Sequence, residues 1–169
     1  MWNENATYWA YTAEWAPNNE DHPISTPVHR YARNIIVSLN HWMEGWIDWN
    51  VVLDETGGPN HVGNFCGAPI MIDTDTGPVY YTPIYYVLAQ LSRTIRPGDK
   101  AVQADTNLVD LDDDALHASA TINGDGLLSV QLLNTTREPI QYSLKIGAQY
   151  AAVEIPANSV QTVRVRLAD

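Results

Sequence analysis

The chain has 169 residues, of which 45% are hydrophobic and 17% are charged, a composition that is globular and excludes a disordered chain. Twenty acidic residues against nine basic ones give a net charge of −11, so repulsion disfavours nucleic acid or an anionic membrane surface as a partner. The longest apolar runs fall short of 18 residues, which excludes a membrane-spanning helix.

The first hundred residues alternate between strand and helix patterns. The short aromatic segment 6–15 predicts a strand followed by a loop. Thr26 and Pro27 predict a helix start, and apolar residues at helical spacing continue the helix to about residue 39. The segment 45–53 predicts the next strand, and a long loop leads from it to a helix over 83–95. This order is typical of βα units with parallel strands, although two such units cannot close a sheet.

From about residue 100 the hydrophobic period changes to two. Apolar and polar residues alternate over 116–122, 128–132, 140–146 and 163–167. The sequence Asn-Gly-Asp-Gly at 123–126 predicts a hairpin turn between the first two of these segments. Four to six short strands joined by turns predict an antiparallel β-sandwich, or part of one.

The segment 45–66, GWIDWNVVLDETGGPNHVGNFC, is chemically the richest in the chain. Aromatic faces that alternate with amides and a carboxylate suit a polar, ring-shaped ligand such as a sugar. The polar neighbours of Trp49 favour a half-exposed platform over a core aromatic. Asp48 alternates with Trp49 along the predicted strand and so points to the other face, as a structural hydrogen-bond acceptor. Asn64 follows a Gly-Gly-Pro turn, where Asn is also common for local backbone reasons.

Other candidate sites are weaker than this one. The five His residues show no metal-ligand spacing, which disfavours a zinc site. Acidic residues at 110, 112, 113 and 114 favour a solvated loop over a calcium site. The single cysteine, Cys66, cannot form an internal disulfide, and it is better explained as a small buried side chain than as a nucleophile. His117 is the only histidine in the second half of the chain.

Two runs of sequence resemble a known family. GWIDWNVVLDETGGPNHVGNF and APIMIDTDTGPVYYTPIYYVLAQLSRTIRPG are similar to glycoside hydrolase family 30, and more narrowly to its glucosylceramidase-type β-glucosidase branch. The resemblance implies the C-terminal part of a (β/α)8 TIM barrel followed by an antiparallel β-sandwich domain. We expect residues 1–98 to hold the last βα units of a truncated barrel and residues 99–169 to form the sandwich. A complete barrel needs roughly 250 residues, so we expect about three-quarters of it to be absent.

The same resemblance implies a set of site residues. Retaining members of the family use two carboxylates about 5 to 5.5 Å apart, one as nucleophile and one as acid/base. Glu14, in YTAEWA, matches the nucleophile; Trp49 matches the aromatic that lies against the sugar ring; Asn64 matches a polar residue near that pocket. The acid/base lies in an Asn-Glu-Pro type motif, which this sequence lacks, and the Asn-Glu-Asn at 3–5 is not that motif. No metal or organic cofactor is implied.

These observations predict a fragment of a retaining β-glycosidase that hydrolyses O-glycosyl bonds of a β-glycoside and is inactive alone because its acid/base is missing. The alternative is a non-catalytic β-sandwich module with a helical extension, which binds carbohydrate or a protein. An open barrel edge also favours pairing with a second copy or with a companion chain that completes the barrel.

Overall fold

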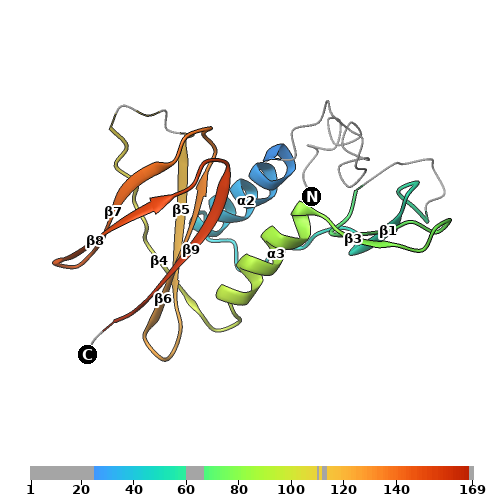
Figure 1. Ribbon diagram of the computed structural model, residues 1–169. Helices are drawn as coiled ribbons and strands as arrows, with labels where there is room; N and C mark the ends of the chain where they lie inside the picture. Colours follow the sequence, from blue (N-terminus) through green and yellow to red (C-terminus); the bar gives the residue numbers. More distant parts are fainter. Residues whose placement is uncertain (1–24, 60–66, 110, 112–113, 168–169) are drawn as a thin grey trace. The chain divides into compact units, whose positions relative to one another are not determined.

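The computed structural model describes residues 25–59, 67–109, 111 and 114–167, which form two helices and nine strands (Figure 1). The helices are α2 (Ser25–Asn40) and α3 (Pro83–Thr94). The strands of the first half are β1 (Val52–Asp54), β2 (Ile70–Ile72) and β3 (Val79–Tyr81). Those of the second half are β4 (Lys100–Val102), β5 (Leu116–Ile122), β6 (Leu127–Asn134), β7 (Ile140–Ile146), β8 (Gln149–Ile155) and β9 (Ser159–Arg166).

The described chain divides into two compact units. One contains residues 25–28 and 46–89, and the other contains residues 29–45 and 90–167. The first unit therefore holds the strands β1 to β3, and the second holds the strands β4 to β9 together with most of α2. Neither described helix is long and apolar enough to cross a membrane.

Both helices form where the hydrophobic spacing predicts them. Helix α2 buries Ala32, Ile35 and Ile36, an i, i+3, i+4 set on one face. It ends in a Schellman motif. The Met43 amide donates to the Ser38 carbonyl at 3.1 Å, and Trp42, the residue before Met43, has a left-handed φ of 66°. Helix α3 ends before Gly98, which has a φ of 93° in the turn that leads to β4, as the Arg-Pro-Gly sequence there predicts.

The first unit contains a small mixed sheet in the order β1-β2-β3. Strands β1 and β2 are parallel, with Leu53 opposite Met71, whereas β3 returns antiparallel to β2. Leu53, Ala68 and Met71 form the buried core of this sheet, and Tyr80 packs against them.

The strand predicted over 45–53 is much shorter in the structure, where only Val52–Asp54 is a strand. A strand is stabilised by hydrogen bonds to a neighbour, and among the described residues the partner strand first reaches this segment at Val51, whose carbonyl accepts from the Ile70 amide at 3.0 Å. The segment between this strand and α3 also contains the β2–β3 hairpin, where the sequence predicted only a loop.

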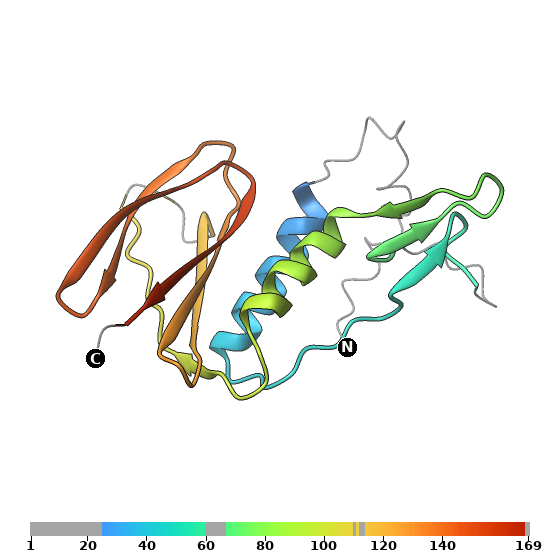
Figure 2. The same cartoon turned by 60° about the horizontal axis from the view of Figure 1, so that its bottom comes forward.

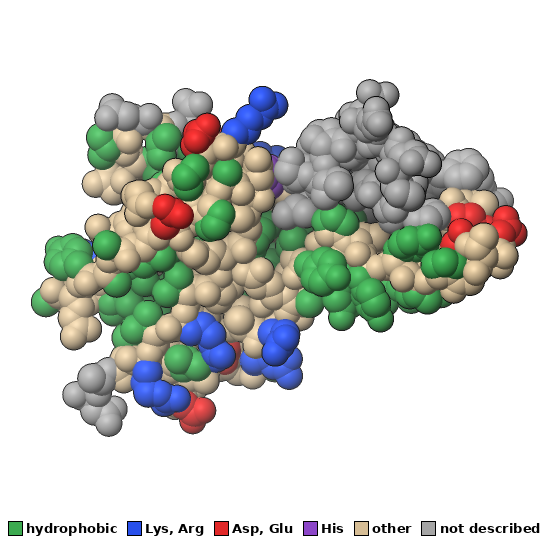
Figure 3. All heavy atoms as spheres, in the orientation of Figure 1, with side chains coloured by type: hydrophobic (Ala, Val, Ile, Leu, Met, Phe, Trp, Pro, Cys, Tyr) green, Lys and Arg blue, Asp and Glu red, His purple; other side chains and the backbone are tan. Residues whose placement is uncertain are grey.

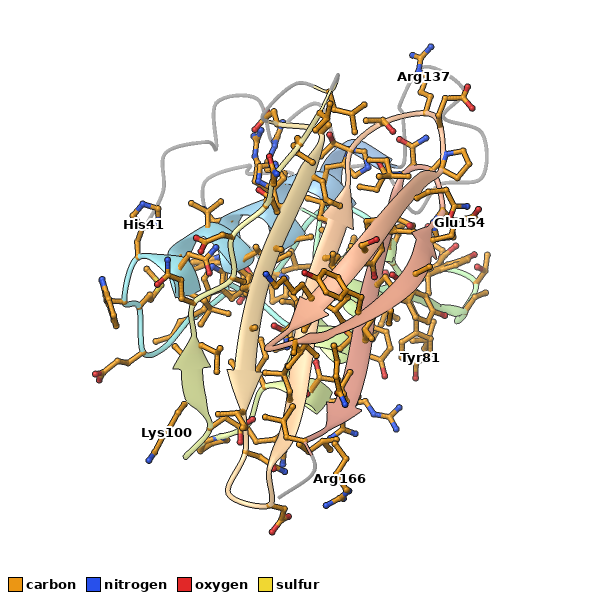
Figure 4. The ribbon with its side chains drawn as sticks, turned by 90° about the vertical axis from the view of Figure 1, so that its left-hand side faces the viewer. His41, Tyr81, Lys100, Arg137, Glu154 and Arg166 are labelled. Carbon is orange, nitrogen blue, oxygen red and sulfur yellow. The ribbon has the colours of Figure 1, made fainter. Side chains whose placement is uncertain are left out.

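The second unit contains the predicted antiparallel β-sandwich. Its larger sheet has the order β4-β5-β6-β9, and its smaller sheet is the β7–β8 hairpin (Figures 1 and 2). The predicted turn at 123–126 joins β5 to β6, where the Asn123 side chain accepts from the Asp125 and Leu127 amides at 2.9 Å. Figure 4 views this unit from the hairpin side, with Arg137 at one end of the sandwich and Lys100 and Arg166 at the other.

Both faces of the larger sheet are covered, because seven of the eight residues of β6 are buried. One face packs against the β7–β8 hairpin through a core of seven buried side chains: Leu116, Ala120, Leu128, Val130, Leu132, Ile140 and Ile155. The side chains that alternate with them, such as Ser129, Gln131 and Leu133, point to the opposite face. Helix α2 lies on that opposite face (Figure 2).

Candidate functional site

Trp49 lies in an extended segment just before β1 and is 70% exposed. Exposure alternates over residues 46–49: Trp46 and Asp48 are half-buried, whereas Ile47 and Trp49 are exposed, and the following residues Asn50 and Val51 are both exposed. Trp49 therefore presents its ring to solvent, and Asp48 belongs to the opposite, more buried side. An exposed indole ring is a suitable surface for the apolar face of a sugar ring.

The loop that follows β1 is organised by the carboxylate of Asp54. One carboxylate oxygen accepts from the Thr56 amide at 2.9 Å, the Thr56 hydroxyl at 2.7 Å and the Gly58 amide at 2.7 Å. The loop closes through the Asp54 amide, which donates to the Gly58 carbonyl at 2.8 Å, and Gly57 turns the chain with a φ of 74°. The hydrogen bond from the Thr56 hydroxyl, followed by that from the Gly58 amide, lowers the pKa of Asp54, so the charged form holds the loop.

Glu55 connects this loop to the turn between β2 and β3. Its two carboxylate oxygens accept from the Thr74 amide at 2.8 Å and the Thr74 hydroxyl at 2.7 Å. These bonds, the amide first, lower the pKa of Glu55. The turn itself is closed by Asp73, whose carbonyl accepts from the Gly77 amide at 2.8 Å. Two loops at one end of the small sheet are thus held by carboxylates, and Figure 3 shows acidic side chains gathered there.

Three tyrosines form a second aromatic group in the same unit. The ring centroids of Tyr81 and Tyr85 are 4.7 Å apart, and those of Tyr85 and Tyr86 are 5.4 Å apart with an edge-on contact. Tyr81 and Tyr86 are largely exposed. Neither these tyrosines nor the contact between Glu55 and Thr74 was predicted from the sequence. The doublets in VYYTPIYY were a signal for the tyrosines, whereas no local pattern indicates the Glu55 contact.

Of the three predicted site residues, the structure describes only Trp49. Glu14 and Asn64 lie outside the described residues, as does Cys66, so their predicted grouping with Trp49 stays a prediction. Of the acidic cluster at 110–114, the carboxylate of Asp114 is described, and it pairs with Arg33 at 3.1 Å. Within the described ranges, no group of three or more His, Cys, Asp or Glu side chains is arranged to hold a metal ion.

Comparison with known families decides which fold these units represent. The model of the glycosyl hydrolase family 30 TIM-barrel domain matches residues 25–95, and the model of the family 30 beta sandwich domain matches residues 101–163. The chain belongs to glycoside hydrolase family 30. Helices α2 and α3 and the β1–β3 sheet therefore lie in the barrel part, and β5 to β8 lie in the sandwich domain. This confirms the fold class that the resemblance implied.

Curated relatives include glucosylceramidases. The chain is 35% identical over 105 residues to putative glucosylceramidase 4 of Caenorhabditis elegans, a match that covers 62% of this chain and 20% of the relative. It is 33% identical over 115 residues to lysosomal acid glucosylceramidase of Mus musculus, which covers 68% of this chain and 22% of the relative. The match thus spans about a fifth of the length of each of these relatives.

Solved structures show the same fold. SrfJ from Salmonella typhimurium aligns with a TM-score of 0.81 at 24% identity, over 89% of this chain and 33% of that one. An endo-β1,6-glucanase aligns with a TM-score of 0.67 at 25% identity, over 80% of this chain and 31% of that one. In both, the aligned part is about a third of the known structure.

Proposed function

We propose that this chain is the C-terminal part of a retaining β-glycosidase of the glucosylceramidase type. The observation that carries the proposal is the pair of family 30 matches, which together run from residue 25 to residue 163. The identity to glucosylceramidases of a nematode and of the mouse supports this branch of the family. The exposed ring of Trp49, in the extended segment just before β1, supports a sugar-binding role, because an exposed indole suits the apolar face of a sugar ring.

In the proposed mechanism, the carboxylate of Glu14 attacks the anomeric carbon and displaces the aglycone oxygen, forming a covalent glycosyl-enzyme. A carboxylic acid on another barrel strand protonates the departing oxygen and then, as a base, takes a proton from the water that releases the sugar. Trp49 lies against the sugar ring and Asn64 binds a hydroxyl group. The second carboxylate is proposed to lie outside this sequence, because no Asn-Glu-Pro motif occurs in it.

The proposal extends to the division of the chain and to its partners. We place the barrel part in residues 1–98 and the sandwich in residues 99–169. The substrate is a β-glycoside. The remaining barrel units are supplied by a longer form of the protein or by a companion chain, and the open edge can also pair with a second copy. The exposed apolar side chains beside Trp49, at Ile47 and Val51, support such a partner, since a large exposed apolar patch is a usual sign of an interface.

Turnover of an aryl β-glucoside tests the proposal. The chain alone should show none. When the chain replaces the matching C-terminal part of an active family 30 glycosidase, the hybrid should be active, and Glu14→Gln should lower its kcat by roughly 10³-fold or more, since the covalent step is lost. Glu4→Gln is the matched control and should leave kcat unchanged. Turnover by the chain alone, or an active hybrid that tolerates Glu14→Gln, would contradict the proposed role of Glu14.

The alternative function, a non-catalytic carbohydrate-binding module, is favoured by one observation, the exposure of Trp49 in this chain. A binding module should respond to sugar without further barrel strands. Saturable quenching of tryptophan fluorescence by a β-glucoside in the isolated chain, lost in Trp49→Ala and kept in Trp42→Ala, would support the module. A flat titration favours the glycosidase fragment.

A further inference from the structure

Helix α2 is attached to the sandwich by polar contacts at two places. The Arg33 guanidinium Nη1 donates to Asp114 Oδ2 at 3.1 Å, and the Asn40 side-chain amide donates to the Ala118 carbonyl at 2.7 Å. Helix α2 lies within the barrel match and Asp114 and Ala118 lie within the sandwich match. These contacts therefore join the two family domains, inside one compact unit of the structure.

His117 sits between these two attachment points. It lies near the start of β5, opposite Leu133 of β6, and therefore points to the face of the sheet that α2 covers. Its side chain is only 13% exposed, and its Nε2 atom lies 3.3 Å from Asp114 Oδ1, though without the geometry of a hydrogen bond. The two oxygens of one carboxylate thus face an arginine from the barrel part and a histidine from the sandwich.

The backbone that carries this carboxylate is fixed. The Thr135 hydroxyl donates to the Asp114 carbonyl at 2.7 Å, and the Thr135 amide donates to the Ala115 carbonyl at 3.0 Å. These bonds hold the Asp114 backbone to the sandwich, whereas its side chain is 71% exposed.

We propose that His117, Asp114 and Arg33 form a proton-sensitive lock between the barrel helix and the sandwich. While His117 is neutral, the carboxylate of Asp114 forms an ion pair with Arg33 alone, and this ion pair helps to hold α2 on the sheet. When His117 takes up a proton, a second cation appears in a largely buried position beside Arg33, with one carboxylate for both. The protonated imidazole gains water if α2 moves off the sheet, so acid loosens this contact.

The charged groups around His117 act in opposite directions. Burial lowers the pKa of His117 and is the largest influence, the Asp114 carboxylate raises it, and the Arg33 guanidinium lowers it. His29, one turn before Arg33 on α2, is also titratable, and its pKa is lowered first by burial and then by the charge of Arg33. When the pKa of a histidine is lower in the folded than in the unfolded state, its contribution to stability is present at a pH above the unfolded-state pKa of about 6.5. This contribution is lost as the pH falls through the folded-state pKa.

NMR titration of the His117 ring in the 169-residue chain tests the lock. The midpoint should lie below the ordinary histidine value of about 6.5; Arg33→Met should raise it, and Asp114→Asn should lower it further. As the pH falls from 7.5 to 5, the protection factors of the α2 amides, corrected for the slower intrinsic exchange at low pH, should fall before those of the β6–β9 amides. His117→Gln should remove most of this change, and the His41→Gln control should keep it.

The lock is wrong if His117→Gln leaves the acid-induced loss of α2 protection unchanged, or if Arg33→Met fails to raise the His117 midpoint. If Asp114→Asn does not fold, the Arg33→Met titration and the His117→Gln exchange data decide the question. None of these measurements requires glycosidase activity, so the lock and the proposed function can fail separately.

Discussion

The β-sandwich and the β1–β3 sheet show two ways of ordering a small sheet. In the sandwich, five of the six strands have seven or eight residues, and seven buried side chains meet between its two layers. In the β1–β3 sheet each strand has three residues and the core has three buried side chains, while carboxylates hold the loops. The sandwich therefore carries its own hydrophobic stability, and the sheet next to the proposed site depends more on polar contacts.

The largest expected effect comes from the sandwich core. Ile155→Ala should lower the free energy of unfolding by about 2–5 kcal/mol, because the removed methyl groups leave a cavity in a fully buried position. Met71→Ala, at an equally buried position of the small sheet, is the partner variant. Hydrogen exchange should show that Ile155→Ala exposes the β5 and β6 amides and that Met71→Ala exposes those of β2. If either variant lowered exchange protection equally in both sheets, the two cores would not be separate.

A smaller effect is expected at the hairpin between β5 and β6. Gly126 has a φ of 72°, which a side chain disfavours, so Gly126→Ala should lower the free energy of unfolding by about 1–2 kcal/mol. Gly124 lies in the same turn outside that region, with open space around it, and Gly124→Ala should be nearly neutral. Urea unfolding of the two variants checks this. If the two variants lowered the free energy of unfolding equally, the positive φ at position 126 would not require glycine.

The smallest effect is expected at the loop after β1 and depends on pH. Because the folded-state pKa of Asp54 is lowered, its contribution to loop order is present above the unfolded value of about 3.9 and is lost as the pH falls through the folded value. Exchange protection of the Thr56 and Gly58 amides should drop in that range. Asp54→Asn should abolish this pH dependence, whereas Glu55→Gln should keep it. A Gly58 amide whose protection is unchanged down to pH 2 would contradict the role of the carboxylate.

The contrast between the two sheets also explains what the sequence could predict. Strands β5 and β6 were predictable because seven or eight alternating residues flank an Asn-Gly-Asp-Gly turn. The β2–β3 hairpin was not, since three-residue strands are too short to show a period and their pairing with β1 is set by distant contacts. The composition of DETGG indicated a turn, but not that Glu55 would bond to Thr74, which lies 19 residues away.

The site was predictable only in part for a related reason. The polar surroundings of Trp49 suggested an exposed platform, and the structure exposes the ring. The roles of Glu14 and Asn64 came from the resemblance to family 30, because a single carboxylate or amide in a loop carries no local signal of catalysis. They remain predictions, as does the domain boundary after residue 98.

The most direct test is to identify the residue that becomes covalently linked to the sugar. The active hybrid described above, treated with a 2-deoxy-2-fluoro β-glucoside that carries a good leaving group, should accumulate a glycosyl-enzyme, since such intermediates form in retaining enzymes and the fluorine slows their hydrolysis. Peptide mass spectrometry should find the sugar on Glu14. A sugar on any other residue, or rapid turnover without a labelled peptide, would contradict the account.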